Sequence, residues 1–249
     1  MWDHFALWGL GGTLFLFLMT TAGSAAVFFF RSQVPQAAQH ATLGFAAGVM
    51  AAASVWSLLL PSIEQAAAFS LPRWLPAAAG MAAGMVFLAG LDRLLCDMQR
   101  EKGRSQSALL FCAITLHNIP EGMAVGLAFA AAQEEKALLA AAALALGIGI
   151  QNFPEGAAIA LPIYQEGGSR RRAFLSGTLS GVVEPVSGMA VMLFAAAAAA
   201  VMPWLLGFAA GAMLYVTVSE LIPQSASRRG TAGFAAGFLL MMILDVALG

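Results

Sequence analysis

Two copies of one polar motif lie inside long apolar stretches of the chain. In each copy the first residue and the glutamate are four positions apart, and the asparagine and the glutamate three apart, so on a helix all three side chains project from one face. An ionisable side chain at that depth is expensive and by default indicates a functional site. The copies are His117-Asn118-Ile119-Pro120-Glu121-Gly122 and Gln151-Asn152-Phe153-Pro154-Glu155-Gly156.

Three carboxylates share this depth, because Glu184 lies in the middle of a third apolar stretch, as Glu121 and Glu155 do in theirs. Charged at a helix centre, each costs about 2.5–3.5 kcal/mol, and the three together cost roughly 7–10 kcal/mol. No lysine or arginine lies at that depth to offset this cost. The partner of the carboxylates must therefore be protons, a cation or water in a cavity.

A proline adjoins each of these glutamates, at positions 120, 154 and 185. Proline removes a helical N–H and frees the carbonyl four residues earlier. A membrane tolerates such a freed carbonyl where it lines a cavity. We therefore expect three kinked helices around a hydrated site.

The polar side chains together offer one imidazole nitrogen, three carboxylates and three amide oxygens. This mixture suits zinc, cadmium, cobalt, iron or manganese and, because it lacks thiolates, does not suit copper(I). Met50, in another apolar stretch, offers a soft sulfur, although a gap-filling core methionine is an equally good interpretation. The candidate ligands from the motifs are His117, Asn118, Glu121, Gln151, Asn152, Glu155 and Glu184.

The elements that carry these residues are predicted to be membrane helices. Of the 249 residues, 60% are hydrophobic and 10% charged, whereas about a quarter are charged in soluble domains. The near-neutral net charge gives no sign of nucleic-acid binding. A membrane helix needs about 20 apolar residues. We predict one all-α integral membrane domain over residues 1–249, with eight transmembrane helices at about 5–30, 38–60, 73–95, 107–132, 137–163, 173–200, 203–224 and 231–248.

Basic residues set the predicted orientation of these helices. Ten of the twelve lysines and arginines fall in the connectors after the first, third, fifth and seventh helices, and only Arg73 and Lys136 fall on the other side. By the positive-inside rule those four connectors are cytoplasmic. Both termini are then extracytoplasmic.

The chain also repeats itself outside the motifs. Residues 43–50 and 206–213 match at seven of eight positions, and residues 80–92 and 233–245 share two glycines and a final Leu-Asp. In the predicted topology these pairs, and the two motif helices, run in opposite directions. Such nesting is the signature of an inverted repeat, which in transporters places the substrate site at the midplane. Asp92 and Asp245, which close their repeats, are expected to be helix caps or ion pairs.

The paired motif, with Glu184 on the next helix, resembles the ZIP (Zrt-/Irt-like) family of divalent metal transporters, and within it the prokaryotic gufA-type subgroup. The resemblance implies a secondary transporter, not an enzyme, that moves zinc or a similar ion (cadmium, iron, manganese) into the cytoplasm. It implies a multi-pass protein of the plasma membrane, in bacteria the inner membrane. The expected partners are divalent ions and the lipid bilayer, with a homodimer as a candidate assembly.

The same resemblance implies a binuclear site between the fourth and fifth helices. The transported ion would be held by His117, Glu121, Gln151 and Glu155 with Met50. A second ion, structural or regulatory, would be held by Asn118, Glu121, Asn152, Glu155 and Glu184. Glu121 and Glu155 would bridge ions about 3.5–4 Å apart. The family also implies an elevator-like movement of helices 1, 4, 5 and 6 against helices 2, 3, 7 and 8.

Four further residues either differ from the ZIP family pattern or lie near a helix end. Gln151 stands where many ZIP proteins have histidine, and a neutral amide should broaden the choice of metal. Asn152 replaces an aspartate of some relatives, which removes a charge from the second site. Glu220, near the inner end of the seventh helix, is a candidate exit site and Glu64, past the outer end of the second, a candidate access site. For both, a solvated helix end is the more ordinary interpretation.

Two other functions fit part of the pattern. Histidine and glutamate around zinc can activate water, which allows an intramembrane metal-dependent hydrolase, but the chain has no His-Glu-x-x-His sequence. Glutamates that relay protons would instead suit a proton-coupled carrier of organic solutes. Substrate cleavage without ion flux would favour the hydrolase, and a solute-driven pH change without bound metal would favour the carrier.

Overall fold

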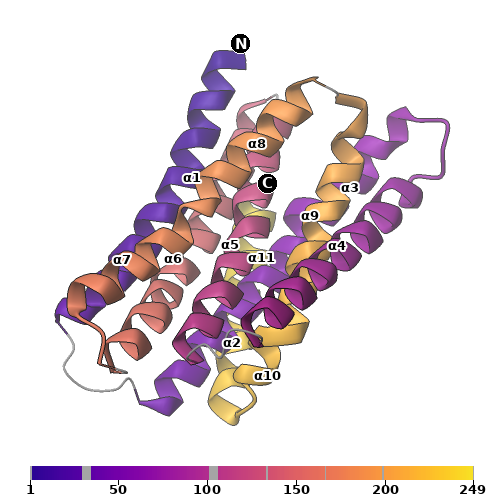
Figure 1. Cartoon of the computed structure of the whole chain (residues 1–249). Coiled ribbons are helices and arrows are strands. Elements are labelled where there is room, and N and C mark those ends of the chain that lie inside the picture. Colours follow the sequence, from indigo (N-terminus) through magenta and orange to yellow (C-terminus); the bar gives the residue numbers. More distant parts are fainter. Residues whose placement is uncertain are drawn as a thin grey trace.

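The computed structural model describes residues 2–29, 35–100, 106–132, 134–165, 167–197 and 199–248, and within these ranges the chain is helical and has no strand (Figure 1). The predicted all-α class is therefore confirmed. The α-helices are α1 (Trp2–Ser24), α2 (Gln36–Ala53), α3 (Leu60–Gln65), α4 (Trp74–Arg100), α5 (Gln106–Ala131), α6 (Glu135–Gln165), α7 (Arg170–Gly181), α8 (Val183–Ala197), α9 (Met202–Val216), α10 (Ile222–Gln224) and α11 (Arg228–Leu248). Short 3₁₀ turns are η1 (Ala25–Phe28), η3 (Ala66–Ala68) and η4 (Ala199–Val201), and π-helical segments are η2 (Ser54–Leu59) and η5 (Thr217–Leu221).

Among the described residues, seven helical stretches are long and apolar enough to cross a membrane: 7–28, 36–68, 74–94, 135–164, 170–195, 202–224 and 228–247. Six of them agree with a predicted span to within about five residues at each end, whereas 36–68 continues past the predicted 38–60, so Glu64 lies within a helix, α3, and not beyond it. The helix α5, which holds the first motif copy, is of similar length but is not among the seven, and several of its side chains lie outside the described residues. Multiple membrane helices are thus confirmed.

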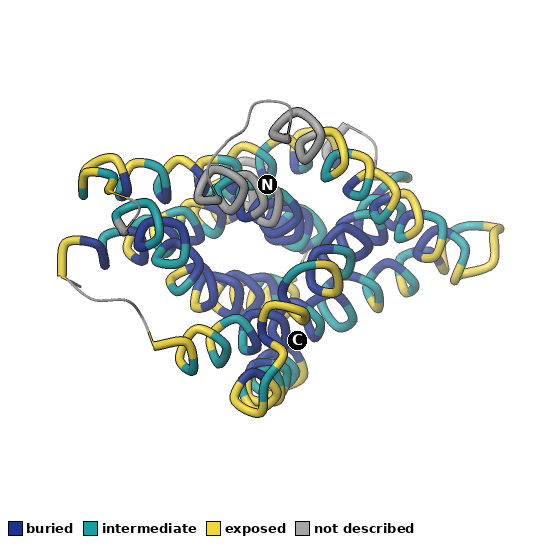
Figure 2. The backbone as a smooth tube through the Cα atoms, turned by 60° about the horizontal axis from the view of Figure 1, so that its bottom comes forward, coloured by how far each residue is buried: buried dark blue, intermediate teal, exposed yellow. Residues whose placement is uncertain are grey.

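The outer faces of the bundle are apolar. Figure 2 shows buried positions gathered where helices face one another and exposed positions on the outside. Large hydrophobic side chains on these outer faces include Val86, 72% exposed, Leu193, 69% exposed, and Val246, 68% exposed. Contiguous exposed apolar surface is rare on soluble monomers, so lipid is the solvent that these faces suit.

Four close helix pairs make up most of the bundle: α2 with α11, α4 with α9, α1 with α6, and α5 with α8. Glycines lie at the contacts, and a Cβ added there would overlap a carbonyl oxygen of the partner helix, as expected for small-residue packing in membranes. Successive contacts advance in the same direction along both helices, so the helices of each pair are parallel. The contacts that show this are Gly44–Gly230 and Gly48–Phe234, Gly80–Trp204 and Gly84–Phe208, Gly149–Phe15 and Gly156–Thr20, and Gly122–Glu184 and Gly126–Gly188.

The two repeated stretches also end alike. After residues 43–50, α2 passes into π-helical η2, and after residues 206–213, α9 passes into π-helical η5. The Ser54 hydroxyl donates to the Met50 carbonyl at 2.7 Å, and the Thr217 hydroxyl donates to the Met213 carbonyl at 2.8 Å. The Met50 and Met213 carbonyls also accept from the backbone N–H of Ser54 and Thr217, so each hydroxyl adds a second hydrogen bond at the point where the α-helix becomes a π-helix. The similarity of the two stretches therefore extends from sequence to local hydrogen bonding.

Only one of the three expected kinks appears as a break in the helix. The helices α5 and α6 continue through Pro120 and Pro154. The third apolar stretch is interrupted at Val182, between α7 and α8, three residues before Pro185. The break at Val182 lies two residues before Glu184, one of the candidate ligands.

Candidate metal centre

The motif side chains come together inside the bundle from three helices. Asn118 and Glu121 lie on α5, Gln151, Asn152 and Glu155 on α6, and Glu184 on α8. Five of these six side chains are completely buried, and Glu155 is 4% exposed. Glu121 lies within electrostatic reach of both Glu155 and Glu184. The structure thus gathers all the motif carboxylates and amides that the sequence singled out.

The first motif copy is tied to its surroundings. The Gln151 amide donates to Glu121 Oε1 at 2.6 Å, which links α6 to α5. The Asn118 amide donates to the Ser180 carbonyl at 3.0 Å. Ser180 lies two residues before the interruption at Val182. Asn118 therefore ties α5 to the end of α7, beside the helix break.

The remaining polar atoms of this cluster have no hydrogen-bond partner in the described part of the chain. Buried polar atoms are nearly always paired, and an unpaired one costs about 1–3 kcal/mol, so a group of them in one place calls for a ligand. Seven of them are oxygens, and oxygen donors suit divalent cations. They are Asn118 Oδ1, Glu121 Oε2, Gln151 Oε1, Asn152 Oδ1, Glu155 Oε1, Glu155 Oε2 and Glu184 Oε2.

The side chains are close to, but not in, a coordinating arrangement. Among the described residues, no three His, Cys, Asp or Glu side chains are placed so that they could hold one metal ion. Glu121 is instead turned toward Gln151 through Oε1. Release of the Gln151 contact would free Glu121 Oε1 as a further oxygen donor for a cation.

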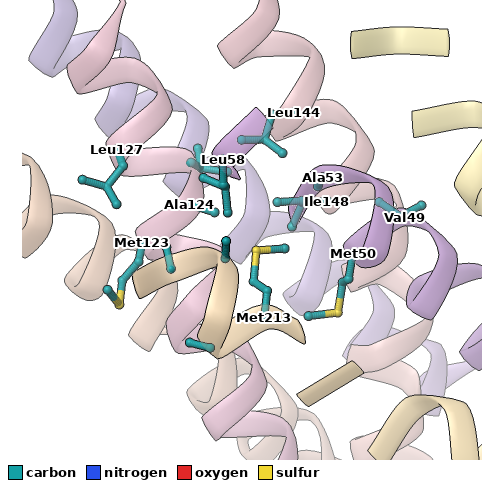
Figure 3. Packing of buried hydrophobic residues seen from close by; sticks show 14 of the residues in the cluster. Val49, Met50, Ala53, Leu58, Met123, Ala124, Leu127, Leu144, Ile148 and Met213 are labelled. Atoms are coloured by element: carbon teal, nitrogen blue, oxygen red, sulfur yellow. The ribbon is translucent and has the colours of Figure 1, made fainter. Parts of the chain in front are cut away.

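His117 and Met50 are the predicted ligands that would supply nitrogen and sulfur donors. The backbone of His117 belongs to α5, but its side chain lies outside the described residues. Met50 is completely buried in an apolar cluster that includes Ile148 and Met213 (Figure 3). Ile148 is on α6, three residues before Gln151, so Met50 packs against the helix that carries the second motif copy. The thioether is near that helix, in surroundings that also suit a core methionine.

A small cavity joins the cluster to Glu220. It has a volume of about 30 Å³ and is lined by Glu155, Glu220, Gln39 and Gln224 together with apolar side chains, which is room for roughly one or two waters. Glu220 itself is half-buried. The predicted exit residue therefore lies on the same small cavity as a motif carboxylate.

A larger cavity, of about 530 Å³, lies between η2, α3, the ends of α5 and α11, and the start of α6. It is lined by the exposed Glu64, the predicted access residue, and also by Lys136 and Asp245. Asp245 is 8% exposed, accepts a hydrogen bond of 2.6 Å from Ser57, and has a second oxygen without a partner. Sequence reasoning placed Asp245 only at a helix end, so it missed this cavity residue.

Its repeat counterpart, Asp92, accepts a hydrogen bond of 3.1 Å from the Tyr215 hydroxyl. Asp92 also interacts electrostatically with Glu220. Asp245 thus lines the larger cavity, whereas Asp92 lies near Glu220, which lines the smaller one. The signal available in the sequence was the shared Leu-Asp that ends both repeats.

Known proteins resemble this chain over most of its length. Residues 97–245 match the family described as ZIP Zinc transporter. The chain is 35% identical to zinc transporter ZIP11 of Xenopus tropicalis over 98% of both chains. It is 38% identical to zinc transporter GufA of Myxococcus xanthus, over 88% of this chain and 90% of that protein. It is 36% identical to zinc transporter ZIPB of Bordetella bronchiseptica, over 85% of this chain and 72% of that protein.

Proposed function

This chain belongs to the ZIP family of zinc transporters, a family of metal-ion transporters rather than enzymes, and we propose that it carries zinc into the cytoplasm through the oxygen cluster between α5, α6 and α8. The observation that carries the proposal is the set of seven unpartnered oxygens buried in one place. No lysine or arginine of the described residues is buried with them. A divalent cation balances carboxylates in such surroundings without a basic side chain.

Two ions fit this donor set. His117, Glu121, Gln151 and Glu155, with Met50, would hold the transported ion. The neighbouring ion would take the oxygens of Asn118, Asn152 and Glu184, and Glu121 and Glu155 would bridge the two at about 3.5–4 Å. Cadmium, iron and manganese accept the same ligand types, so the proposal includes them as weaker or alternative substrates.

Eight spans with both termini outside agree with the helix pairing. When α5 is counted as a span and α7 with α8 as one, every close pair joins spans that are an even number of places apart along the chain. Spans that alternate in direction give parallel pairs only in that case. In Figure 1 both chain ends lie in the upper part of the bundle. The excess of basic residues at the other end makes that end cytoplasmic.

The ion path runs from the larger cavity to the cluster and then to the smaller cavity. The bundle divides into two groups, one with α1, α5, α6, α7 and α8 and the other with α2, α4, α9 and α11. Every described glycine whose added Cβ would meet the backbone of another helix meets a helix of its own group, although some glycines within the first group meet side chains only. Gly147, between the groups, meets only the side chains of Met241 and Val49. The two groups therefore do not meet through the close glycine-to-backbone contacts that join helices within a group. This supports sliding of the first group, with its carboxylates, along the second.

Zinc uptake by vesicles that contain the purified protein tests the function. We expect uptake by the wild type, and its loss in Glu121→Ala and Glu155→Ala. The loss should exceed the about 10–100-fold that removal of an outer-shell partner costs, because a bridging ligand is gone. Glu134→Ala is the control, since Glu134 is exposed. Normal uptake by both cluster variants would rule out the proposed site, and zinc accumulation in cells that express the protein tests the inward direction.

A further inference from the structure

One polar group reaches the carboxylate cluster from outside the two motifs and α8. The hydroxyl of Thr20, on α1, donates a hydrogen bond to Glu184 Oε1 at 2.8 Å. Both side chains are completely buried. The hydroxyl also lies 3.3 Å from the carbonyl of Leu16 in its own helix. Because a hydroxyl has one proton to donate and a carboxylate is the stronger acceptor, the shorter contact to Glu184 is the dominant one.

The backbone around Thr20 is held by close packing. Gly156 lies against the Thr20 carbonyl, and Gly23 lies against the carbonyl of Phe153, so α1 and α6 touch backbone to backbone. The Ser24 hydroxyl adds a hydrogen bond of 3.3 Å to the Gly156 carbonyl. A Cβ on Gly181, the last residue of α7, would meet the side chain of Thr20 at 3.1 Å. Thr20 is therefore fixed against the second motif copy and beside the helix break.

The hydrogen bond from Thr20 engages only one of the two oxygens of the Glu184 carboxylate. Oε1 is engaged by Thr20, while Oε2 has no partner and is one of the seven free oxygens of the cluster. A side chain held at one oxygen cannot rotate away from the cluster without losing a charge-assisted hydrogen bond. Groups that orient a metal ligand in this way typically change metal affinity about 10–100-fold when they are removed.

We propose that Thr20 is a positioning residue, which holds Glu184 so that Oε2 faces the bound ions. This inference rests on the proposed metal-binding function of the cluster. It adds α1, which carries no motif, to the elements that determine the affinity of the Glu184 half of the site. The residue itself does not contact the ion.

Zinc binding to the full-length purified protein, measured by calorimetry as stoichiometry and affinity, tests this role. Thr20→Val keeps the shape of the side chain and removes the hydroxyl. We expect one class of zinc ions to bind about 10–100-fold more weakly, while the protein still folds and binds its other zinc ions as the wild type does. Thr20→Ser keeps the hydroxyl and should bind zinc as the wild type does. Thr13→Val is the matched control, because the buried Thr13 hydroxyl bonds only to carbonyls of its own helix, at 3.0 Å to Gly9 and 3.2 Å to Leu10.

The outcomes separate the two proposals. If the wild type binds no divalent ion, the metal-binding function fails and the role of Thr20 fails with it. If the wild type binds zinc and Thr20→Val binds it equally well, only the positioning role is overturned. Equal weakening in Thr20→Val and Thr20→Ser would also overturn it, because the hydroxyl would then not be the cause. Should Thr20→Val not fold, Thr20→Ala against Thr20→Ser gives the same comparison.

Discussion

The two copies of the motif share asparagine, proline, glutamate and glycine but differ in what surrounds them. In the first copy Asn118 donates to the Ser180 carbonyl and Glu121 accepts from Gln151. In the second copy Gln151 makes that bond to Glu121, Asn152 lies beside the carboxylates of Glu121 and Glu184 without a hydrogen bond of regular geometry, and neither oxygen of Glu155 has a partner. One sequence pattern thus forms an anchored half and a free half of the same cluster.

The glycines that end the two copies pack against different partner helices. Gly122 packs against the carbonyl of Glu184 on α8, and Gly156 packs against the carbonyl of Thr20 on α1. Both neighbours belong to the Thr20–Glu184 hydrogen bond. A repeat therefore fixes which residue types face inward, while the partner helix decides whether each is held or left free. Substitutions at matching positions can separate these two contributions.

The largest effect is expected at the glycines. In Gly122→Ala and Gly156→Ala the new methyl would overlap a backbone carbonyl of the partner helix, so the helices must separate. Overpacking of this kind costs about 1–3 kcal/mol. The two carbonyls belong to Glu184 and Thr20, whose side chains are joined by a hydrogen bond. Separation of the helices should therefore lower zinc affinity as well. Melting temperature and zinc affinity measure the two results. The matched control is Gly11→Ala, where a Cβ meets nothing within 4 Å; equal stability of all three variants would contradict the packing argument.

The asparagines should give the next largest difference. Asn118→Ala removes the hydrogen bond that ties α5 to the buried Ser180 carbonyl, which costs about 0.5–1.5 kcal/mol of stability. Asn152→Ala removes an amide that lies beside Glu121 and Glu184 without a hydrogen bond of regular geometry, so the loss of stability should be smaller than in Asn118→Ala while zinc binding weakens. Thermal unfolding of the metal-free protein checks the first result and calorimetry the second. Equal losses of stability in the two variants would show that the copies are not anchored differently.

Much of this arrangement was accessible from the sequence, because apolar length marks membrane helices and the spacing of the motif puts Asn118 and Glu121 on one face. The carboxylates that burial makes expensive were also found together, as their cost suggested. The break at Val182 was not located, since proline indicates a kink but not which nearby residue leaves the helix. Asp245 was missed because its role depends on the cavity beside η2.

Thr20 illustrates the limit most clearly. A threonine in an apolar helix usually bonds to a carbonyl of its own helix, as Thr13 does. The sequence therefore makes Thr13 and Thr20 alike. Only the rotation of α1 against α6 and α8, which depends on packing of whole helices, sends one of the two hydroxyls to a carboxylate.

The smallest expected effect is on metal preference, at the position where the copies differ in chemistry. In the proposed site Gln151 would bind the ion through its amide oxygen, while its amide N–H₂ donates to Glu121 Oε1. Gln151→His replaces that amide with an imidazole, which suits zinc better than manganese, whereas Gln151→Glu adds an oxygen donor that suits manganese. We expect the zinc-to-manganese affinity ratio to move in opposite directions in the two variants, each by about five-fold, on the order of 1 kcal/mol. Competition binding measures the ratio. A shift in the same direction would mean that Gln151 acts through its hold on Glu121, because both variants remove that amide, and not through its own donor atom.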